Sequence, residues 1–265
     1  MQSTVRKLIK LFRLVKILFT NPFEAFDRIS VIFEIYLNKI LFYKKPNTYY
    51  LFNDFLKIIP DSISNKIEEA NKELEDIKNL FIKNISKLNY LPYPLYYNAD
   101  YTLAILCYIY VRNFKPELAI ETGVGYGISS SMILAAMNNN KKGKLISIDL
   151  PPLGDSEGNF SGIAIPTDLK YRWSIYFGSS HKILKNLLKS ISQVDFFISD
   201  SANVFTIQRR ELKLILPKLK TNSVCIFNNI SLKMYKFLKN LDGFSFYCIR
   251  QEEKKDCMSG LIIKQ

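Results

Sequence analysis

Three glycines at alternate positions could bring the backbone close to an anionic ligand. Gly123, Gly125 and Gly127 follow the apolar run at residues 118–120, and Ser129 then begins a second apolar stretch. This order predicts a strand, a tight glycine-rich turn and a helix with serines in its first turn. Glycine allows positive φ and a close approach of a ligand, and the free N–H groups of a helix N-terminus attract anions.

A carboxylate at the right distance from this turn predicts which ligand the site takes. The apolar run at residues 145–148 ends at Asp149, about twenty residues beyond the glycines, where an acid can accept hydrogen bonds from ribose hydroxyls. The two motifs together predict a nucleoside site in an α/β domain. A dinucleotide fingerprint would need a glycine at position 128, but the residue there is Ile128, which disfavours an oxidoreductase of the Rossmann type.

Composition favours a packed protein. The chain has 265 residues, of which 48% are hydrophobic, so it can form one large domain and an additional region. The apolar run at residues 101–111 is too short to span a bilayer, and no signal peptide is recognisable. Four cysteines without a C-x-x-C pair are expected to be buried free thiols in a reducing compartment, which favours a cytoplasmic protein: Cys107, Cys225, Cys248 and Cys257.

The net charge of +13 has two interpretations. It is compatible with an anionic partner, but Lys and Arg are spread over the whole chain, as a general compositional bias would spread them. Residues 1–20 form a basic amphipathic stretch with Arg6, Lys10 and Arg13 on one side of a helix and Val5 and Phe12 opposite. This helix could lie on an anionic membrane or pack on the protein, and both remain open. No nucleic acid partner is expected, and the oligomeric state is not predicted.

The periodicity of the remaining chain divides it into two regions. Residues 1–97 are expected to be a helical N-terminal region, and residues 98–265 an α/β domain in which five strands alternate with helices. Two further strands near residues 244–249 and 261–264 predict an antiparallel hairpin. The glycine- and proline-rich span at residues 151–166 is long for a plain loop and predicts a binding loop or a lid.

With these motifs in view, residues 97–265 resemble the class I S-adenosylmethionine-dependent methyltransferases. The likeness is closest to small-molecule O-methyltransferases that modify catechols and sugars. It is carried by E-T-G-x-G-x-G from Glu121, by I-D-L-P-P around Asp149, and by V-D-F-F-I-S-D-S ending at residue 201. The resemblance implies a Rossmann-like, seven-stranded sheet with an antiparallel C-terminal hairpin, and S-adenosylmethionine as the cofactor.

The resemblance also implies residue roles in the cofactor site. The methionine part of the cofactor would contact the glycine-rich turn, with its carboxylate at Ser129, and Asp149 would bind the ribose. Ser180 and His181 would lie beside the adenine, although His181, the only histidine, could equally be an ordinary residue in the first turn of a helix. The implied cofactor-binding residues are Glu121, Gly123, Gly125, Gly127, Ser129, Asp149, Ser180 and His181.

The implied reaction centre departs from the family pattern. Asp200 matches the first metal-binding acid, but the pair after the next strand is Asn228 and Asn229, and Asn203 stands where relatives carry a base. One carboxylate and two amides bind Mg²⁺ poorly, so a metal is not expected. Asp200 and Asn203 remain the candidate catalytic residues. Two functions stay open: methyl transfer to a small molecule or glycan by positioning alone, and a catalytically degenerate protein that binds the cofactor.

Overall fold

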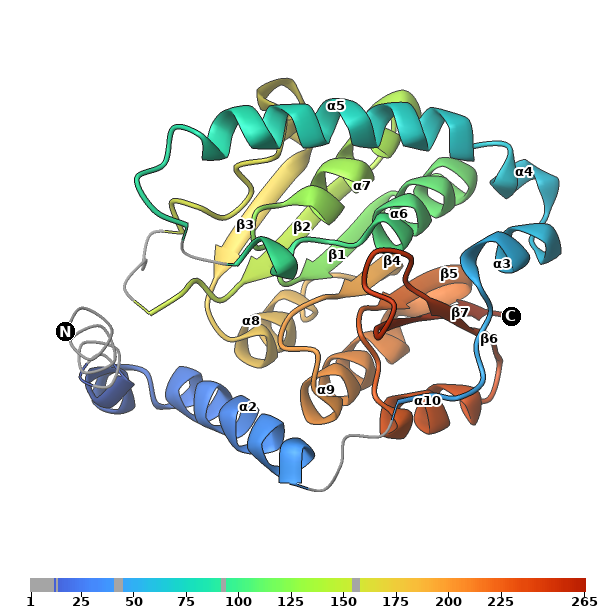
Figure 1. Cartoon of the computed structure of the whole chain (residues 1–265). Helices are drawn as coiled ribbons and strands as arrows, with labels where there is room; N and C mark the ends of the chain where they lie inside the picture. The colour runs from blue at the N-terminus through green and yellow to red at the C-terminus, as the bar shows by residue number, and fades with distance from the viewer. Residues whose placement is uncertain (1–11, 13, 41–44, 92–93, 154–157) are drawn as a thin grey trace.

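A seven-stranded sheet forms the centre of the protein, with helices on both faces (Figure 1). The computed structural model describes residues 12, 14–40, 45–91, 94–153 and 158–265. The strand order is β3-β2-β1-β4-β5-β7-β6, with β1 to β5 parallel and β7 antiparallel to both of its neighbours. The predicted fold class is therefore confirmed, including the antiparallel hairpin.

The parallel strands are short runs buried on both faces, which is why their sequences are almost continuously apolar. In chain order the strands are β1 (Leu118–Thr122), β2 (Lys144–Asp149), β3 (Trp173–Phe177), β4 (Val194–Ser199), β5 (Leu219–Phe227), β6 (Phe244–Arg250) and β7 (Met258–Lys264). The strand order reverses between β1 and β4. In sheets of this kind, ligands bind at the carboxyl ends of the strands beside such a reversal.

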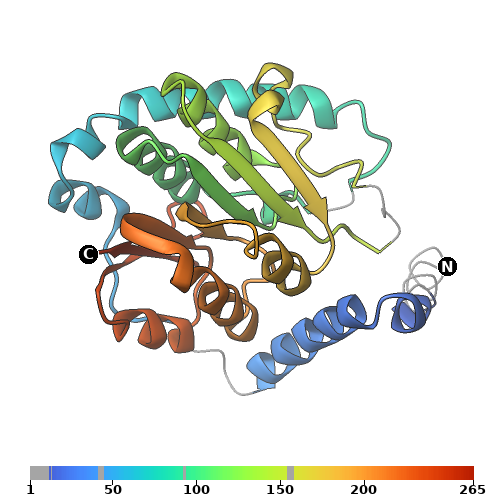
Figure 2. The ribbon, with the colours of Figure 1, turned by 180° about the vertical axis from the view of Figure 1, so that it is seen from behind.

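Three helices cover one face of the sheet, and Figure 2 shows them from behind. They are α5 (Ile67–Ile85), α6 (Tyr101–Phe114) and α7 (Ile128–Asn139). Helix α6 is apolar nearly all round because it is enclosed between the sheet and its two neighbours, and its residues 102–111 are all buried.

Helices α8 (Ser180–Leu187), α9 (Phe205–Ile215) and α10 (Leu232–Lys239) cover the other face, over a second apolar cluster. Ser231 caps α10 by accepting a hydrogen bond from the backbone N–H of Met234. Short 3₁₀ segments lie at Leu95–Tyr97, Thr167–Arg172 and Leu216–Lys218. All four cysteines are buried free thiols, as predicted.

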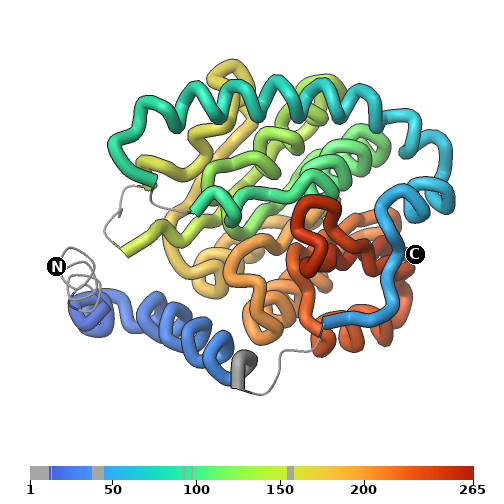
Figure 3. Tube along the Cα trace, in the orientation of Figure 1, coloured from blue at the N-terminus to red at the C-terminus, as the bar shows by residue number. Residues whose placement is uncertain are grey.

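The N-terminal helices contact the sheet domain in different ways. Helices α3 (Phe52–Ile58) and α4 (Asp61–Ser64) share the core of α5 and α6, and Tyr50 forms a parallel bridge to Ile249 at the edge of β6 (Figure 3). Helix α2 (Pro22–Ile40) lies apart from them, on the side of α8 and α9. No helix among the described residues is long and apolar enough to cross a membrane.

Of the basic stretch at residues 1–20, the described residues 12 and 14–20 are helical. Arg6, Lys10 and Arg13 lie outside the described residues. The exposed side chains of the helical segments that follow therefore bear on whether this stretch contacts a membrane or packs on the protein.

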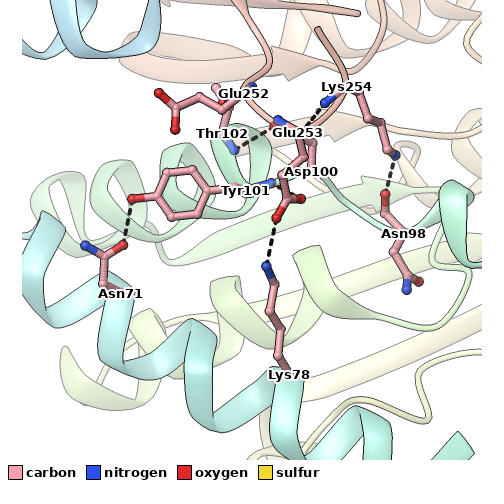
Figure 4. Close-up of polar contacts among 9 residues, drawn as sticks. All are labelled: Asn71, Lys78, Asn98, Asp100, Tyr101, Thr102, Glu252, Glu253 and Lys254. Atoms are coloured by element: carbon pink, nitrogen blue, oxygen red, sulfur yellow. Dashed lines mark hydrogen bonds and ion pairs between the residues drawn. The ribbon is translucent and has the colours of Figure 1, made fainter.

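Asp100 joins the start of α6 to the loop between β6 and β7 (Figure 4). Its carboxylate caps α6 and also accepts the backbone N–H groups of Glu253 and Lys254 at 2.8 and 2.9 Å. Glu253 in turn pairs with Lys78 of α5 at 3.0 Å and accepts the backbone N–H of Tyr101. This junction fixes the loop beside residues 98 and 99, which line the cavity described next.

Candidate functional site

A cavity of about 440 Å³ lies at the carboxyl ends of β1, β2 and β4, at the reversal of strand order. Most of the residues expected at the cofactor and reaction sites line it. These are Gly123, Gly125, Gly127, Ser129, Asp149, Ser180, Asp200 and Asn203. Four others from the sequence prediction are not in its wall: Glu121, His181, Asn228 and Asn229.

The glycines of the turn differ in what surrounds them. A Cβ at Gly123 would lie 2.3 Å from the backbone oxygen of Asp200, so a side chain there would push β1 and β4 apart. A Cβ at Gly125 would meet nothing within 4 Å, although its φ of +52° is unusual for other residues. Gly123 therefore permits close packing, whereas Gly125 leaves open space in the cavity wall.

Glu121 stabilises the turn from beneath and does not face the cavity. Its carboxylate is fully buried and accepts hydrogen bonds from Ser129, Ser130 and Ser147 at 2.6 to 2.8 Å. Burial raises the pKa of this carboxyl from 4.5 to about 7, although the three hydroxyl groups oppose the change. The residue thus ties β1 to β2 and to the first turn of α7.

The N-terminus of α7 opens into the cavity without a side-chain cap. Its N-cap residue is Gly127, which has no side chain to accept the first N–H groups, and Ser129 of the first turn lines the cavity. Free N–H groups at a helix N-terminus carry partial positive charge. This end of the cavity is therefore suited to a carboxylate or a phosphate.

Asp149 ends β2 and places a nearly buried carboxylate in the cavity wall. It accepts hydrogen bonds from the backbone N–H of Val124 at 3.2 Å and from the hydroxyl of Ser161 at 2.5 Å. Burial raises its pKa, and these donors oppose the rise. Ser161 belongs to the glycine- and proline-rich span, which packs on the turn through a bond from Gly162 N–H to the Gly125 carbonyl.

That packing places part of the predicted binding loop against the glycine-rich turn. Residues 154–157 of the span lie outside the described residues.

Ser180 and His181 begin α8 but point to different surroundings. Ser180 lines the cavity. The Nδ1 atom of His181 is buried and has no hydrogen-bond partner among the described residues. Burial lowers the pKa of this imidazole, and the nearby Arg210 lowers it further. Of the two residues that the resemblance implies beside the adenine, Ser180 lines the cavity, whereas His181, which could equally be an ordinary residue of the first helical turn, does not.

Around Asp200, amide groups occupy the positions where a metal site would need free oxygens. The side-chain N–H of Asn228 donates to Asp200 at 2.5 Å, and the side-chain oxygen of Asn228 accepts from Gln251 at 2.5 Å. Burial raises the pKa of Asp200 to about 6, against the Asn228 hydrogen bond and the charge of Lys254. Within the described residues, no three His, Cys, Asp or Glu side chains gather as a metal site.

Asn203 stands on the same wall in a left-handed backbone conformation, with φ of +53°. Its side-chain N–H lies 3.5 Å from the Asp200 carboxylate, and its buried side-chain oxygen has no hydrogen-bond partner among the described residues. An unpaired buried acceptor is costly, so a ligand hydroxyl that donated to it would be stabilised. Asn229, also at positive φ, does not line the cavity, and neither does Asn228.

The sequence did not predict the wall formed by the N-terminal helices. Asp27, Arg28, Val31 and Ile32 of α2 line the cavity, together with Leu14. These residues are far from the turn in the sequence, and no local motif marks them as site residues. The only indication was the recurrence of charged residues on one side of α2.

The strand order, with β7 antiparallel between β5 and β6, is the one that the resemblance to class I methyltransferases implies. Residues 120–230 match the family model described as "Methyltransferase domain". No curated protein matches the chain by sequence.

The protein is similar in fold to solved structures of methyltransferases, at low sequence identity. One is the O-methyltransferase from Bacillus cereus in complex with SAH, with a TM-score of 0.55 and 14% identity over 78% of this chain and 93% of that chain. Another is the O-methyltransferase TomG from Streptomyces achromogenes in complex with SAM, with a TM-score of 0.51 and 14% identity over 88% and 95% of the two chains. At this identity the likeness shows the fold.

Proposed function

We propose that the protein is an S-adenosylmethionine-dependent O-methyltransferase acting on a small molecule or a glycan. The observation that carries this proposal is the meeting of three features in one cavity: the open space at Gly125, the uncapped N-terminus of α7 and the carboxylate of Asp149. They fit the amino acid part and the ribose of one ligand. The similar structures contain SAH or SAM, which supports the same cofactor here.

The residues of the cavity would each hold one part of the cofactor. The free N–H groups of α7 near Ser129 would bind its carboxylate, and Asp149 would accept hydrogen bonds from its ribose hydroxyls. Ser180 would lie on the adenine side. Glu121 would act indirectly, because its three serine contacts fix the turn that the cofactor touches. When bound, the cofactor supplies a methyl group on a positively charged sulfur.

Asp200 and Asn203 would position the acceptor. An acceptor hydroxyl that donates to the unpaired oxygen of Asn203 would lie beside the carboxylate of Asp200. With a pKa of about 6, Asp200 can take up a proton near neutral pH, but only weakly. Orientation would therefore supply most of the rate. We propose that this reaction needs no metal, since Asn228 directs an N–H group at Asp200 where a metal ligand would direct an oxygen.

The alternative is a protein that binds the cofactor without transferring the methyl group. The specific observation in its favour is the pair Asn203 and Asn228, neither of which can act as a base. The two functions differ in whether methyl groups reach any phenolic or sugar hydroxyl.

The cofactor assignment is tested by calorimetry with SAH on the wild type and on Asp149→Ala. Loss of a charge-assisted hydrogen bond should weaken binding by about 1.5–3 kcal/mol, or roughly 10- to 150-fold. Asp168→Ala is the matched control, because Asp168 is an exposed acid on the 3₁₀ segment before β3. Equal SAH binding by the wild type and Asp149→Ala, or no binding by the wild type at millimolar SAH, would contradict the assignment.

A further inference from the structure

Helix α2 is oriented with its polar side toward the protein. Asp27 is buried, forms an ion pair with Arg210 of α9 at 2.8 Å and accepts a hydrogen bond from Ser179. Arg28 donates to the backbone oxygen of Pro151 at 2.7 Å. The charged residues of α2 therefore hold it against the cavity mouth.

The acids of α2 that flank these residues also have partners. Glu24 pairs with Arg28 at 2.9 Å, and Glu34 accepts the backbone N–H of Thr206 at 3.3 Å. Every acidic side chain of α2 is thus bound to Arg28 or to groups of the main body, so none is directed to the opposite side of the helix.

The opposite side of α2 is apolar and faces solvent. Phe26, Ile29, Phe33 and Tyr36 recur at intervals of three and four residues, which places them on one side of the helix. Phe26 is 66% exposed and Phe33 is 61% exposed. A surface helix normally buries such a side and exposes its charges. We call this side, with Phe23, the outer face of α2.

The helical turn before α2 extends this apolar surface. Val15, Leu18 and Phe19 are all exposed, and Phe19 is 86% exposed. Exposed apolar patches of such extent are typical of protein or membrane contacts. The outer face of α2 and these three side chains therefore need a partner that covers them.

We propose that the outer face of α2 docks on an anionic lipid bilayer. Residues 1–20 contain five basic residues and no acid, and they directly precede the exposed apolar side chains. An interfacial helix combines these two properties: apolar side chains enter the acyl boundary, and nearby Lys and Arg contact anionic headgroups. The inference is independent of the cofactor assignment.

Charge also favours an anionic bilayer over a second copy of this chain as the partner of the outer face. A second copy of this chain carries the same net charge of +13, and this like charge opposes its association with the outer face. An anionic bilayer offers the complementary charge. Helix α2 carries five charged residues in its nineteen and satisfies no criterion for a span, so it would lie along the surface.

Co-sedimentation of the full chain with vesicles tests the docking. We expect binding to vesicles of phosphatidylcholine with phosphatidylglycerol, and weak binding to phosphatidylcholine alone. The double variant Phe26→Asp/Phe33→Asp should bind at least about tenfold less. The matched control is Ile58→Asp/Ile82→Asp, which places the same charges on exposed apolar positions of α3 and α5 and should bind as the wild type does.

Fluorescence gives a second measurement that does not depend on a charged variant. The indole N–H of the native Trp173 donates a hydrogen bond to the hydroxyl of Ser147 at 2.9 Å within the sheet domain, so brominated lipid should not quench its fluorescence. Phe33→Trp should add a signal that brominated lipid quenches, whereas Ile58→Trp should not. Failure of the wild type to sediment with anionic vesicles would overturn the proposal. So would an unquenched Phe33→Trp, or a wild-type dimer that Phe26→Asp/Phe33→Asp converts to a monomer without any vesicle binding.

SAH calorimetry without lipid separates this inference from the proposed function. A wild type that binds SAH but not anionic vesicles would contradict the docking alone. A wild type that binds anionic vesicles but not SAH would contradict the cofactor assignment alone.

Discussion

Replacing Asn228 by Asp converts a hydrogen-bond donor into a second acid beside Asp200. In the wild type the Asn228 amide donates to the Asp200 carboxylate at 2.5 Å; Asn228 is buried, and Asp200 is half-buried in the cavity wall. The variant loses this donor and places two carboxyl groups in contact. It therefore tests whether the amide is what allows Asp200 to stay charged without a metal.

The loss of folding free energy caused by Asn228→Asp can be estimated in two ways that agree. Two ionised carboxylates that relax to about 4 Å repel by about 4 kcal/mol at an effective dielectric constant of 20. If one of them instead holds a proton at pH 7, raising its pKa from 3.9 to at least 7 costs roughly 1.36 kcal/mol per unit, again about 4 kcal/mol. For a chain of this size, about 4 kcal/mol lowers Tm by roughly 8–16 °C.

Thermal unfolding with and without Mg²⁺ measures this effect. The Tm of the wild type should not change with Mg²⁺, whereas that of Asn228→Asp should be low and should rise by several degrees as the ion binds the paired carboxylates. Asn228→Ala is the control, since it loses the donor and gains no charge, so its Tm should be low and independent of Mg²⁺. A wild type that Mg²⁺ stabilises, or whose methyl transfer a chelator abolishes, would refute the reasoning.

Two further predictions concern the glycine-rich turn. Because the pKa of Glu121 rises from 4.5 unfolded to about 7 folded, its contribution to stability is present below pH 4.5 and is lost as pH rises to about 7. In chemical denaturation, the free energy of unfolding of Glu121→Gln should therefore increase relative to that of the wild type as pH rises from 4.5 to about 7. A difference between the two proteins that stays constant with pH would contradict the raised pKa of Glu121. Gly123→Ala should lower Tm strongly because its Cβ meets Asp200, whereas Gly125→Ala should keep a near-native Tm and bind SAH roughly tenfold less tightly, or about 1.4 kcal/mol. Equal Tm values for the two glycine variants would contradict the packing argument.

Much of the fold could be predicted because local pattern and tertiary packing agree. Strands β1 and β2 and the start of α7 were predicted from short apolar runs, the glycine-rich turn and the serines after it, and these features do not depend on distant contacts. Strand β5 begins at Leu219, although its continuous apolar run begins only at Val224. Residues 220–222 are polar and exposed, and Asn222 has a φ of +67°, so this part of the strand lacks an apolar pattern.

The candidate site was only partly predictable. Residues at strand ends, such as Asp149 and Asp200, follow from the sheet topology because parallel strands end on one edge. The contribution of α2 does not, since Asp27 meets Arg210 across 183 positions in sequence. The amphipathic pattern of α2 was visible, but the usual rule would bury its apolar side. Here the polar side is buried, because its charges have partners on α9.

The antiparallel end of the sheet constrains the order in which parts of the protein can fold. Strand β7 lies between β5 and β6 although it follows both in the chain, so the sheet is complete only when the last strand of the chain has paired with β5. The loop before it is held by Asp100, whose bond to Glu253 closes a separation of 153 residues. Closing so long a loop costs chain entropy before any contact is gained. Local segments such as β1 to β2 can form early, whereas the start of α6 acquires its full set of hydrogen bonds only when this loop arrives.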